Sequence, residues 1–453
     1  MKNRKRKFEC YSFYDRTGIE AHLRHMAAKG WLIEKISNQY WTYQKIEPAD
    51  ICFSVSYYAK ASDFDPQPRE GQQTYIDYCE QTGWNLACRW FQMQVFYNTD
   101  PHATPIHTDP VLEVEAIHKG CKSNFLKSYL VLAMISLVFS VLALSSLLGD
   151  FLLYLASPVK LTCAVCVLLL FTLCLVDLIS YYRWLHRARK AAENDDFMET
   201  PSTSGFQKGI LWICGLSFSW WLVNVLFSKN IVLAWSAFGI IGCIIILQLL
   251  VPALKDWMKR KNVSKGANIV LTLAACVILS FVLVGGVVSV GVHCITQTGP
   301  NPVYLRDNLK ATDLMESDNI PAIFYREKHD ESILIARHEV EPMLHHSSGE
   351  DGKPTPYLAY TQITVKFSPI QNFCAGVLRW NMKTDRMWRG EVLKENASRW
   401  GADAAWKLHV DGTDPQYLLQ YGNVLVRLQL DWEPDPSQCA AVGTFFKSTA
   451  DNR

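Results

Sequence analysis

Histidine and glutamate side chains, which are common metal ligands, gather in the stretch that follows position 337. The stretch contains His338, Glu339, Glu341, His345 and His346. Metal sites usually place such ligands at short, regular spacings, whereas here a proline interrupts the run and the sequence GEDGKPTP follows it. This pattern favours a solvated loop, and we expect neither a metal ion nor another cofactor.

Cysteines could do redox chemistry in two places. Cys163 and Cys166 form a CxxC motif, but the apolar sequence around them is typical of a membrane helix, where small residues serve packing. Cys374 and Cys439 each fall in a predicted helix of the C-terminal part. A disulfide between them and a pair of buried thiols are both compatible with the sequence, because spacing alone does not determine connectivity.

The sequence lacks the common signatures of catalysis. It contains no nucleophile elbow, P-loop, zincin helix or dinucleotide-binding fingerprint, so we expect a protein that is not an enzyme. Its 45 basic residues nearly balance its 43 acidic ones, which excludes a nucleic-acid binder with a dominant basic field. We therefore expect no direct contact with nucleic acid.

Five long apolar segments occupy the middle of the chain. Each has about the ~20 residues that a helix needs to cross the hydrocarbon core of a bilayer, so the lipid bilayer is an expected partner. The start of the second span is the least defined, because residues 151–155 could extend it. The spans are predicted at 128–148, 158–181, 210–227, 231–251 and 267–292. They divide the chain into domains at 1–120, 121–296 and 297–453.

Basic residues are distributed unevenly among the loops between these spans. The loops 182–209 and 252–266 carry five lysines or arginines each, whereas the loops on the opposite side carry a single lysine. Loops rich in lysine and arginine stay in the cytoplasm. We therefore predict a multi-pass protein of the cell membrane with a cytoplasmic N-terminus and, because five is odd, an extracytoplasmic C-terminus.

Asp177 is an ionisable residue inside a predicted span, where a carboxylate is costly. Coupling-ion and proton sites use such residues, but the sequence offers Asp177 no partner within the membrane. It lies about one turn from the cytoplasmic end of its span, next to Tyr181, Tyr182 and Arg183. An interfacial carboxylate beside a basic loop is therefore the favoured interpretation.

The first hundred residues contain one pattern twice. A predicted helix over 18–29 is followed by Gly30-Trp31, and a helix over 72–82 is followed by Gly83-Trp84, 53 positions later. Each glycine suits the left-handed cap that ends a helix. We predict two βαββ repeats that form one antiparallel sheet with both helices on one face. The strands are predicted at 8–14, 32–36, 40–46, 51–58, 86–89 and 92–97.

Aromatic residues of these repeats could line a cleft for a ligand or a partner segment. The candidates are Trp31, Trp41, Tyr43, Trp84 and Phe96. Aromatic side chains dominate protein cores in general, so packing between the two halves is the favoured interpretation and binding is the alternative.

The order of these motifs resembles a known family. The helix ending MAAKGW, the strand pair YWTYQKIEPADICFSVSYY and the segment YIDYCEQTGWNLACRWFQMQVFY are similar to the bacterial domain-of-unknown-function family 2812. The resemblance covers about the first quarter of the chain. It implies a membrane-anchored member, because relatives are often followed by membrane helices. It also implies a cytoplasmic regulatory partner, because relatives are often encoded beside PadR-like repressors in Gram-positive bacteria. The family has no established activity, so it supplies no catalytic residues.

Residues 297–453 predict one α+β domain. Gly422-Asn423 lies between two β-rich runs and is a strong hairpin signal. Ser437 is a candidate N-cap for a helix that follows it. Strands are further predicted at 332–336 and 358–367, and helices at 370–382, 390–400 and 438–447.

The whole chain is interpreted as a regulatory or signal-transducing membrane protein. Its architecture would be an α+β cytoplasmic domain that binds a protein partner, five transmembrane helices and an α+β extracytoplasmic domain that senses a signal. Gly285 and Gly286, near the outer end of the last span, are expected to permit close helix packing and to carry the coupling. The alternative is an accessory or permease-like transport component with a solute-binding outer domain. The oligomeric state is left open.

Overall fold

Two compact units make up the chain, and each is described by itself. The first comprises Met1–Val141, Val165–Ser217 and Phe238–Val287, and the second comprises Leu142–Ala164, Phe218–Ala237 and Val288–Arg453. The computed structural model describes residues 3–37, 40–100, 102–123, 125–227, 231–298, 308–315, 325–342, 356–384, 390–409 and 414–451.

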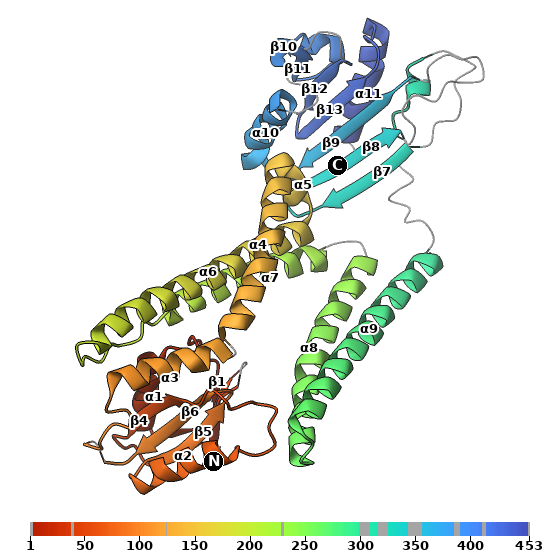
Figure 1. The fold of residues 1–453 in the computed structure, drawn as a ribbon. Helices are drawn as coiled ribbons and strands as arrows, with labels where there is room; N and C mark the ends of the chain where they lie inside the picture. Colours follow the sequence, from red (N-terminus) through yellow and green to blue (C-terminus); the bar gives the residue numbers. More distant parts are fainter. Residues whose placement is uncertain are drawn as a thin grey trace. The chain divides into compact units, whose positions relative to one another are not determined.

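The N-terminal domain, residues 3–123, contains two three-stranded antiparallel sheets (Figure 1). Their strand orders are β1-β3-β2 and β4-β6-β5, so the two halves have the same topology. The elements are β1 (Arg4–Lys7), α1 (Arg16–Ala28), β2 (Trp31–Lys35), β3 (Trp41–Lys45), β4 (Cys52–Tyr57), α2 (Glu70–Gln81), β5 (Asn85–Trp90), β6 (Met93–Asn98) and α3 (Pro110–Ser123).

The hairpins of the two halves share their register. Ile33 pairs with Tyr43, and 53 positions later Leu86 pairs with Phe96. In both hairpins the register shifts directly after that pair. Bulged edge strands do not readily continue a ladder. The prediction of a single sheet is therefore wrong. β2 and β5 are the edge strands of two separate sheets.

Gly30 and Gly83 end α1 and α2 as the sequence predicts. Their φ angles are +79° and +90°, in the region that favours glycine. At Gly30 a side chain is also excluded by space, because a Cβ atom there would lie 2.9 Å from the carbonyl oxygen of Ile46.

The segment Phe8–Tyr14 is not the strand that its aromatic residues predict. The first strand is β1, which pairs with β3 from Arg4–Gln44 to Lys7–Trp41. Residues 12–15 are buried at four successive positions, whereas a half-buried strand would bury alternate ones. The segment is irregular because these four successive side chains are all buried, although they point in different directions.

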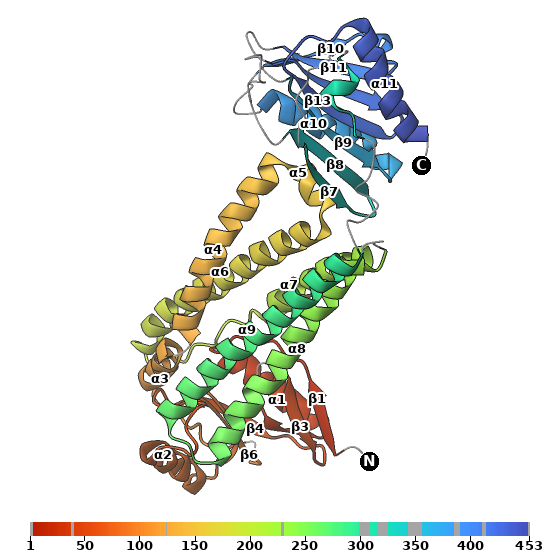
Figure 2. The same cartoon turned by 90° about the vertical axis from the view of Figure 1, so that its right-hand side faces the viewer.

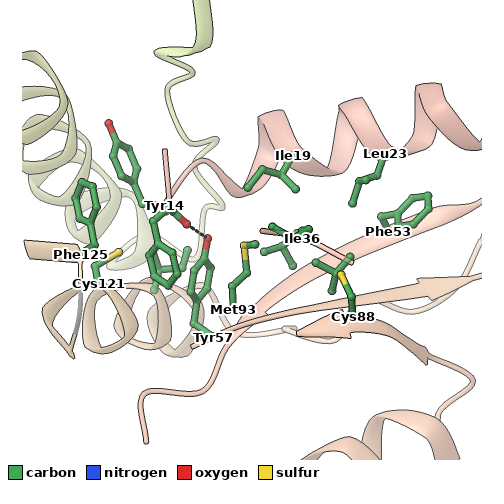
Figure 3. Close-up of a cluster of buried hydrophobic side chains, with 14 of the residues drawn as sticks. Tyr14, Ile19, Leu23, Ile36, Phe53, Tyr57, Cys88, Met93, Cys121 and Phe125 are labelled. Atoms are coloured by element: carbon green, nitrogen blue, oxygen red, sulfur yellow. Dashed lines mark hydrogen bonds between the residues drawn. The ribbon is translucent and has the colours of Figure 1, made fainter. Parts of the chain in front are cut away.

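The core of the N-terminal domain lies between α1 and the strands. Ile19 and Leu23 of α1 are each 1% exposed, and Figure 3 shows Leu23 beside Phe53 of β4 and Ile19 above Ile36. In the same figure the hydroxyl of Tyr57 donates a hydrogen bond of 2.7 Å to the carbonyl oxygen of Phe13. The core thus includes the irregular segment as well as the sheets.

Five of the described helices are long and apolar enough to cross a membrane, as the sequence predicts. Their charged ends extend beyond the predicted spans, because a helix can continue past the hydrocarbon core into water. They are α4 (Phe125–Gly149), α6 (Pro158–Ala192), α7 (Ser204–Phe227), α8 (Ile231–Arg260) and α9 (Lys265–Thr298).

A short helix, α5 (Phe151–Ala156), separates α4 from α6, so residues 151–155 do not extend the second span. Asp150 caps α5 by accepting a hydrogen bond of 3.1 Å from the Leu153 N–H. Pro158 then begins α6, at a position where its missing N–H costs nothing.

The C-terminal domain, residues 308–451, is built on a seven-stranded antiparallel sheet (Figures 1 and 2). The strand order is β10-β11-β12-β13-β9-β8-β7. The predicted hairpin at Gly422-Asn423 joins β12 to β13, where Tyr421 pairs with Val424. The elements are β7 (Tyr325–Glu331), β8 (Ile335–Pro342), β9 (Leu358–Val365), α10 (Gln371–Thr384), β10 (Glu391–Glu395), β11 (Ala404–His409), β12 (Gln416–Tyr421), β13 (Val424–Leu430) and α11 (Pro436–Asp451).

Three predictions for this domain are wrong. Residues 391–395 form β10 rather than a helix, because they pair with β11 at the edge of the sheet. Residues 332–334 form the turn between β7 and β8 rather than a strand. The cap of α11 is Asp435, whose carboxylate accepts hydrogen bonds from the N–H groups of Ser437 and Gln438 at 2.8 and 2.9 Å.

Separate cores cover the two faces of this sheet. α11 packs with Tyr417 and Leu419 of β12, whereas α10 packs with Leu418 of the same strand. Because successive strand residues point to opposite faces, α10 and α11 lie on opposite sides of the sheet. α5 joins the α10 core through two fully buried residues, Leu152 and Ala156.

Cys374 and Cys439 do not form a disulfide. Both thiols are free and fully buried, with Cys374 on α10 in one core and Cys439 on α11 in the other. A sheet separates them, and a disulfide requires Cα atoms within about 7 Å. Of the two interpretations that the sequence allows, the buried thiols are the one observed.

Candidate functional site around Asp177

Asp177 is a buried carboxylate of the first unit that accepts hydrogen bonds from three side chains. It lies on α6 and is 0% exposed. The hydroxyl of Thr203 donates to its Oδ1 atom at 2.7 Å, and the hydroxyl of Ser12 donates to the same atom at 3.1 Å. The side-chain amide of Gln207 donates to Oδ2 at 3.0 Å. We call these four residues the Asp177 cluster.

The partners of Asp177 are neutral groups that also bond to one another. The hydroxyl oxygens of Ser12 and Thr203 lie 2.8 Å apart, so one of these hydroxyl groups donates to the other. Gln207 has two amide hydrogens, one for Asp177 and one for the Ser12 oxygen at 2.7 Å. No lysine, arginine or histidine forms an ion pair with Asp177 within the described ranges. Neutral donors therefore satisfy the buried carboxyl group.

The cluster connects three separate pieces of the chain. Asp177 is on α6, Ser12 belongs to the irregular segment of the N-terminal domain, and Thr203 and Gln207 lie together at the start of α7. The hydroxyl of Tyr14 adds a long hydrogen bond of 3.4 Å to the carbonyl oxygen of Asp177. Burial raises the pKa of Tyr14 above its usual range, and the nearby carboxylates act in the same direction, so this hydroxyl keeps its proton.

A reciprocal pair of threonines extends the contact. The N–H of Thr17 donates to the Thr200 hydroxyl oxygen at 2.9 Å, and the N–H of Thr200 donates to the Thr17 hydroxyl oxygen at 3.0 Å. The same region holds Asp15, which caps α1 by accepting from the Gly18 N–H at 2.9 Å. A Cβ atom at Gly18 would lie 2.5 Å from that carboxylate, so the cap requires glycine there.

Aromatic rings pack beside these polar contacts. The ring centroid of Tyr14 lies 5.2 Å from Tyr181 and 5.6 Å from Phe125. Tyr181 and Trp184 are at most 2% exposed and share one core with the strands of the N-terminal domain. Within the first unit, therefore, the ends of α4 and α6 and the N-terminal domain form one hydrophobic core.

A second contact attaches the N-terminal domain to α8 and α9. Asp63 forms ion pairs with Lys255 and, at 3.5 Å, with Lys259. The side-chain amide of Asn268 on α9 donates to the carbonyl oxygen of Phe64 at 3.4 Å. Four helices of the first unit, α6, α7, α8 and α9, thus carry polar side chains that contact the N-terminal domain.

The five aromatic residues predicted to line a cleft are not gathered in one place. Trp41 and Tyr43 are buried in the core shared with α6, whereas Trp84 and Phe96 are buried in a smaller core with α2. Trp31 is half-buried, with the Lys5 ammonium 5.3 Å from its ring centroid. These positions suit packing, and a binding role for them stays a prediction.

The histidine stretch is only partly described. His338 lies on β8, 3.6 Å from a carboxylate oxygen of Glu327, and Glu339 forms ion pairs with Lys328 and Arg337. His345 and His346 lie outside the described residues. Among the described residues no group of three or more metal-ligating side chains is found.

Sequence reasoning identified Asp177 but missed its partners. Ser12, Thr203 and Gln207 are ordinary polar residues, and Ser12 lies 165 positions from Asp177. One signal was available: the polar run Thr200 to Ser204 directly precedes a span, where hydroxyl groups can satisfy an intramembrane carboxylate.

Comparison with known proteins supports the resemblance noted from the sequence. No curated protein and no solved structure matches the chain. The matched family is described only as a protein of unknown function, so it assigns no activity to the Asp177 cluster. The N-terminal part of this chain, residues 15–130, is accordingly a match to the family DUF2812.

Proposed function

We propose that this chain is a regulatory, signal-transducing protein of the cell membrane. In this proposal the C-terminal domain is extracytoplasmic and receives a signal. The N-terminal domain is cytoplasmic and binds a protein partner, which by family resemblance is a PadR-like regulator. The basic loops 182–209 and 252–266 support the orientation.

The observation that carries the proposal is the course of α6. This helix of 35 residues follows α5, whose Leu152 and Ala156 are buried in the core of the C-terminal domain. Its other end contributes Asp177 and Tyr181 to the contacts with the N-terminal domain. At 1.5 Å per residue it is about 50 Å long, enough to cross a bilayer without a break.

Charged contacts fix the start of α6 to the sheet of the C-terminal domain. Arg337 on β8 forms an ion pair with Asp150, the cap of α5, and is itself only 8% exposed. Lys160, in the first turn of α6, lies 3.7 Å from a carboxylate oxygen of Asp330 on β7. A change in the sheet would therefore act directly on the start of α6.

The environment of Asp177 favours regulation over the permease-like alternative. A carboxylate that couples transport has to exchange its partners with an ion or proton during the cycle. Asp177 instead accepts hydrogen bonds from three residues that attach the N-terminal domain. We regard it as part of a docking contact.

We further propose that the N-terminal domain is a duplicated βαββ unit. The common strand order, the equal register of the hairpins and the offset of 53 positions support this. A duplicated unit offers two related surfaces, which suits a partner that is itself a symmetric dimer.

The proposal is tested by perturbing α5 and observing the N-terminal domain. In full-length protein in lipid nanodiscs, Leu152→Ala would leave a cavity beneath α5. We expect hydrogen exchange in residues 8–18 to become about 5- to 150-fold faster, the range of a typical coupling of ~1–3 kcal/mol.

The matched control is Leu428→Ala on β13. Leu428 is also fully buried, but it lies in the core on the other face of the sheet, with α11. This variant should loosen the C-terminal domain without changing exchange in residues 8–18. Equal effects of the two variants, or none from Leu152→Ala, would contradict a signal path through α5 and α6.

A further inference from the structure

A cavity of about 380 Å³ lies beside the C-terminal part of α6. Its wall includes Arg183, Trp184 and Arg187 of α6, together with Glu199 and Thr200 from the segment that leads to α7. The cavity lies entirely within the first unit, next to the threonine pair that attaches the N-terminal domain.

The two arginines of the cavity present a pair of unused positive charges. They are four positions apart on one helix, so their side chains lie on the same face. Both are exposed. Within the described part of the chain, neither forms an ion pair with a carboxylate. Paired guanidinium groups match the geometry of phosphate oxygens, to which they can donate several parallel hydrogen bonds.

Two residues of the cavity wall, Trp184 and Thr200, also take part in the contacts with the N-terminal domain. Trp184 is 2% exposed, and its indole N–H is buried without a hydrogen-bond partner among the described residues. The hydroxyl of Thr200 already takes part in the contacts with Asp15 and Thr17. A group bound here would therefore touch the segment that attaches the N-terminal domain.

The position of the cavity along α6 points to the membrane surface. The apolar stretch of the helix precedes it, and Tyr181, Tyr182 and Trp184 lie at the change from apolar to basic sequence. Tyrosine, tryptophan and arginine at such a boundary are typical of the level of lipid headgroups.

We propose that this cavity binds a phosphate group through Arg183 and Arg187. The two sources of that group are the headgroup of an anionic phospholipid and a soluble phosphate. The site does not depend on the regulatory function proposed above. Glu199 is the opposing charge, because it is an exposed carboxylate in the same wall. It weakens binding without abolishing the positive excess of the arginine pair.

Native mass spectrometry of the detergent-purified, full-length protein tests this site. One arm adds phosphatidylglycerol and a second adds phosphatidylcholine, and a third adds inorganic phosphate to the phosphatidylglycerol complex. Arg183→Gln/Arg187→Gln should weaken phosphatidylglycerol binding about tenfold or more, and Glu199→Gln should strengthen it. Competition by millimolar phosphate would assign the site to a soluble phosphate. Its absence, with preference over phosphatidylcholine, would assign the site to the lipid headgroup.

The matched control is Arg189→Gln/Lys190→Gln. It removes the same charge from two exposed positions on the same helix that do not line the cavity. This control should bind phosphatidylglycerol within about twofold of the wild type, because general attraction by the basic loop is small next to direct contact. Equal losses in both double variants, or no loss in Arg183→Gln/Arg187→Gln, would overturn the proposal. Equal thermal unfolding of all variants establishes that folding is not the cause.

Discussion

At the scale of single residues, the feature that stands out is a buried carboxyl group that forms no ion pair with any of the described residues. Asp177 accepts hydrogen bonds from two hydroxyl groups and one amide, which come from two distant parts of the chain, Ser12 and the segment from Thr203 to Gln207. A hydrogen bond to a charged group contributes about 1.5–3 kcal/mol. The arrangement is also specific, because Asp177 loses hydrogen bonds if either of the two parts moves away.

Asp177→Asn should loosen the N-terminal domain without unfolding it. The amide is the same size but uncharged, and its NH₂ group would face the donors of Ser12, Thr203 or Gln207. We expect hydrogen exchange in residues 8–18 of the protein in nanodiscs to become about 10- to 100-fold faster. The control is Asp195→Asn, the same change at an exposed residue whose φ of +58° asparagine tolerates. Unchanged exchange in Asp177→Asn would mean that the cluster does not hold the domain.

Glu20 on α1 predicts a pH dependence of stability. Its carboxylate accepts a hydrogen bond of 2.8 Å from the Val55 N–H, and burial raises its pKa to about 7, against the opposing effect of Arg16. The folded state therefore binds this proton more tightly than the unfolded state, whose pKa is near 4.5. The contribution of Glu20 to stability is greatest below pH 4.5 and declines as the pH rises to 7.

Glu20→Gln should remove that decline. Glutamine keeps the acceptor for Val55 and has no charge to bury, so the variant should be more stable than the wild type at pH 8 and similar to it at pH 4.5. The expected difference is of the order of 1–3 kcal/mol. Thermal unfolding of both full-length proteins across this pH range measures it. A difference that stays constant with pH would refute the raised pKa of Glu20.

At the scale of elements, the connection from the C-terminal domain to the membrane helices is made by α5 as well as by the chain after α9. α5 is only six residues long, yet its buried face joins the core with α10, and its cap pairs with Arg337. The glycines of α9 lack comparable contacts among the described residues. Among the described residues, a Cβ atom at Gly285 or Gly286 would meet no atom within 4 Å, so the described part of the chain shows no close helix packing at these two glycines.

Gly286→Leu should consequently leave the coupling unchanged in the single chain. The new side chain enters open space and improves helix propensity by a few tenths to ~1 kcal/mol. We expect wild-type exchange in residues 8–18, in contrast to Leu152→Ala. The measurement is the same nanodisc experiment with both variants side by side. A larger effect from Gly286→Leu than from Leu152→Ala would indicate that the signal passes through α9 instead of α5 and α6.

At the scale of the whole molecule, five long apolar helices separate two α+β domains. Each domain supplies the groups that hold its own ends of the helices, namely the Asp177 cluster and the Asp63 ion pairs in one unit and Arg337 and Asp330 in the other. Attachment at more than one helix is what a domain needs if it is to respond to rigid-body shifts of those helices.

The proposed orientation predicts that the two termini lie on opposite sides of the membrane. Fusions of a reporter active only in the cytoplasm should be active after Asn194 and inactive after Arg453. The uneven distribution of lysine and arginine among the loops is the physical reason. A cytoplasmic Arg453 would contradict the proposal that the C-terminal domain senses an external signal.

The sequence by itself determined the features that depend on local composition and periodicity. The five apolar helices follow from length and hydropathy, the turn at Gly422 from its residue types, and the helix ends at Gly30 and Gly83 from their need for positive φ. The match of residues 15–130 to a family rests on motif order in the same way.

Only the tertiary structure decided the features that depend on residues far apart in the chain. Spacing could not reveal that Ser12 and Gln207 satisfy Asp177, or that a sheet lies between Cys374 and Cys439. Residues 8–14 are predicted as a strand because aromatic residues favour strands, yet the burial of residues 12–15 at successive positions accompanies an irregular segment. Local preferences amount to a fraction of a kcal/mol per residue, and burial against distant segments outweighs them.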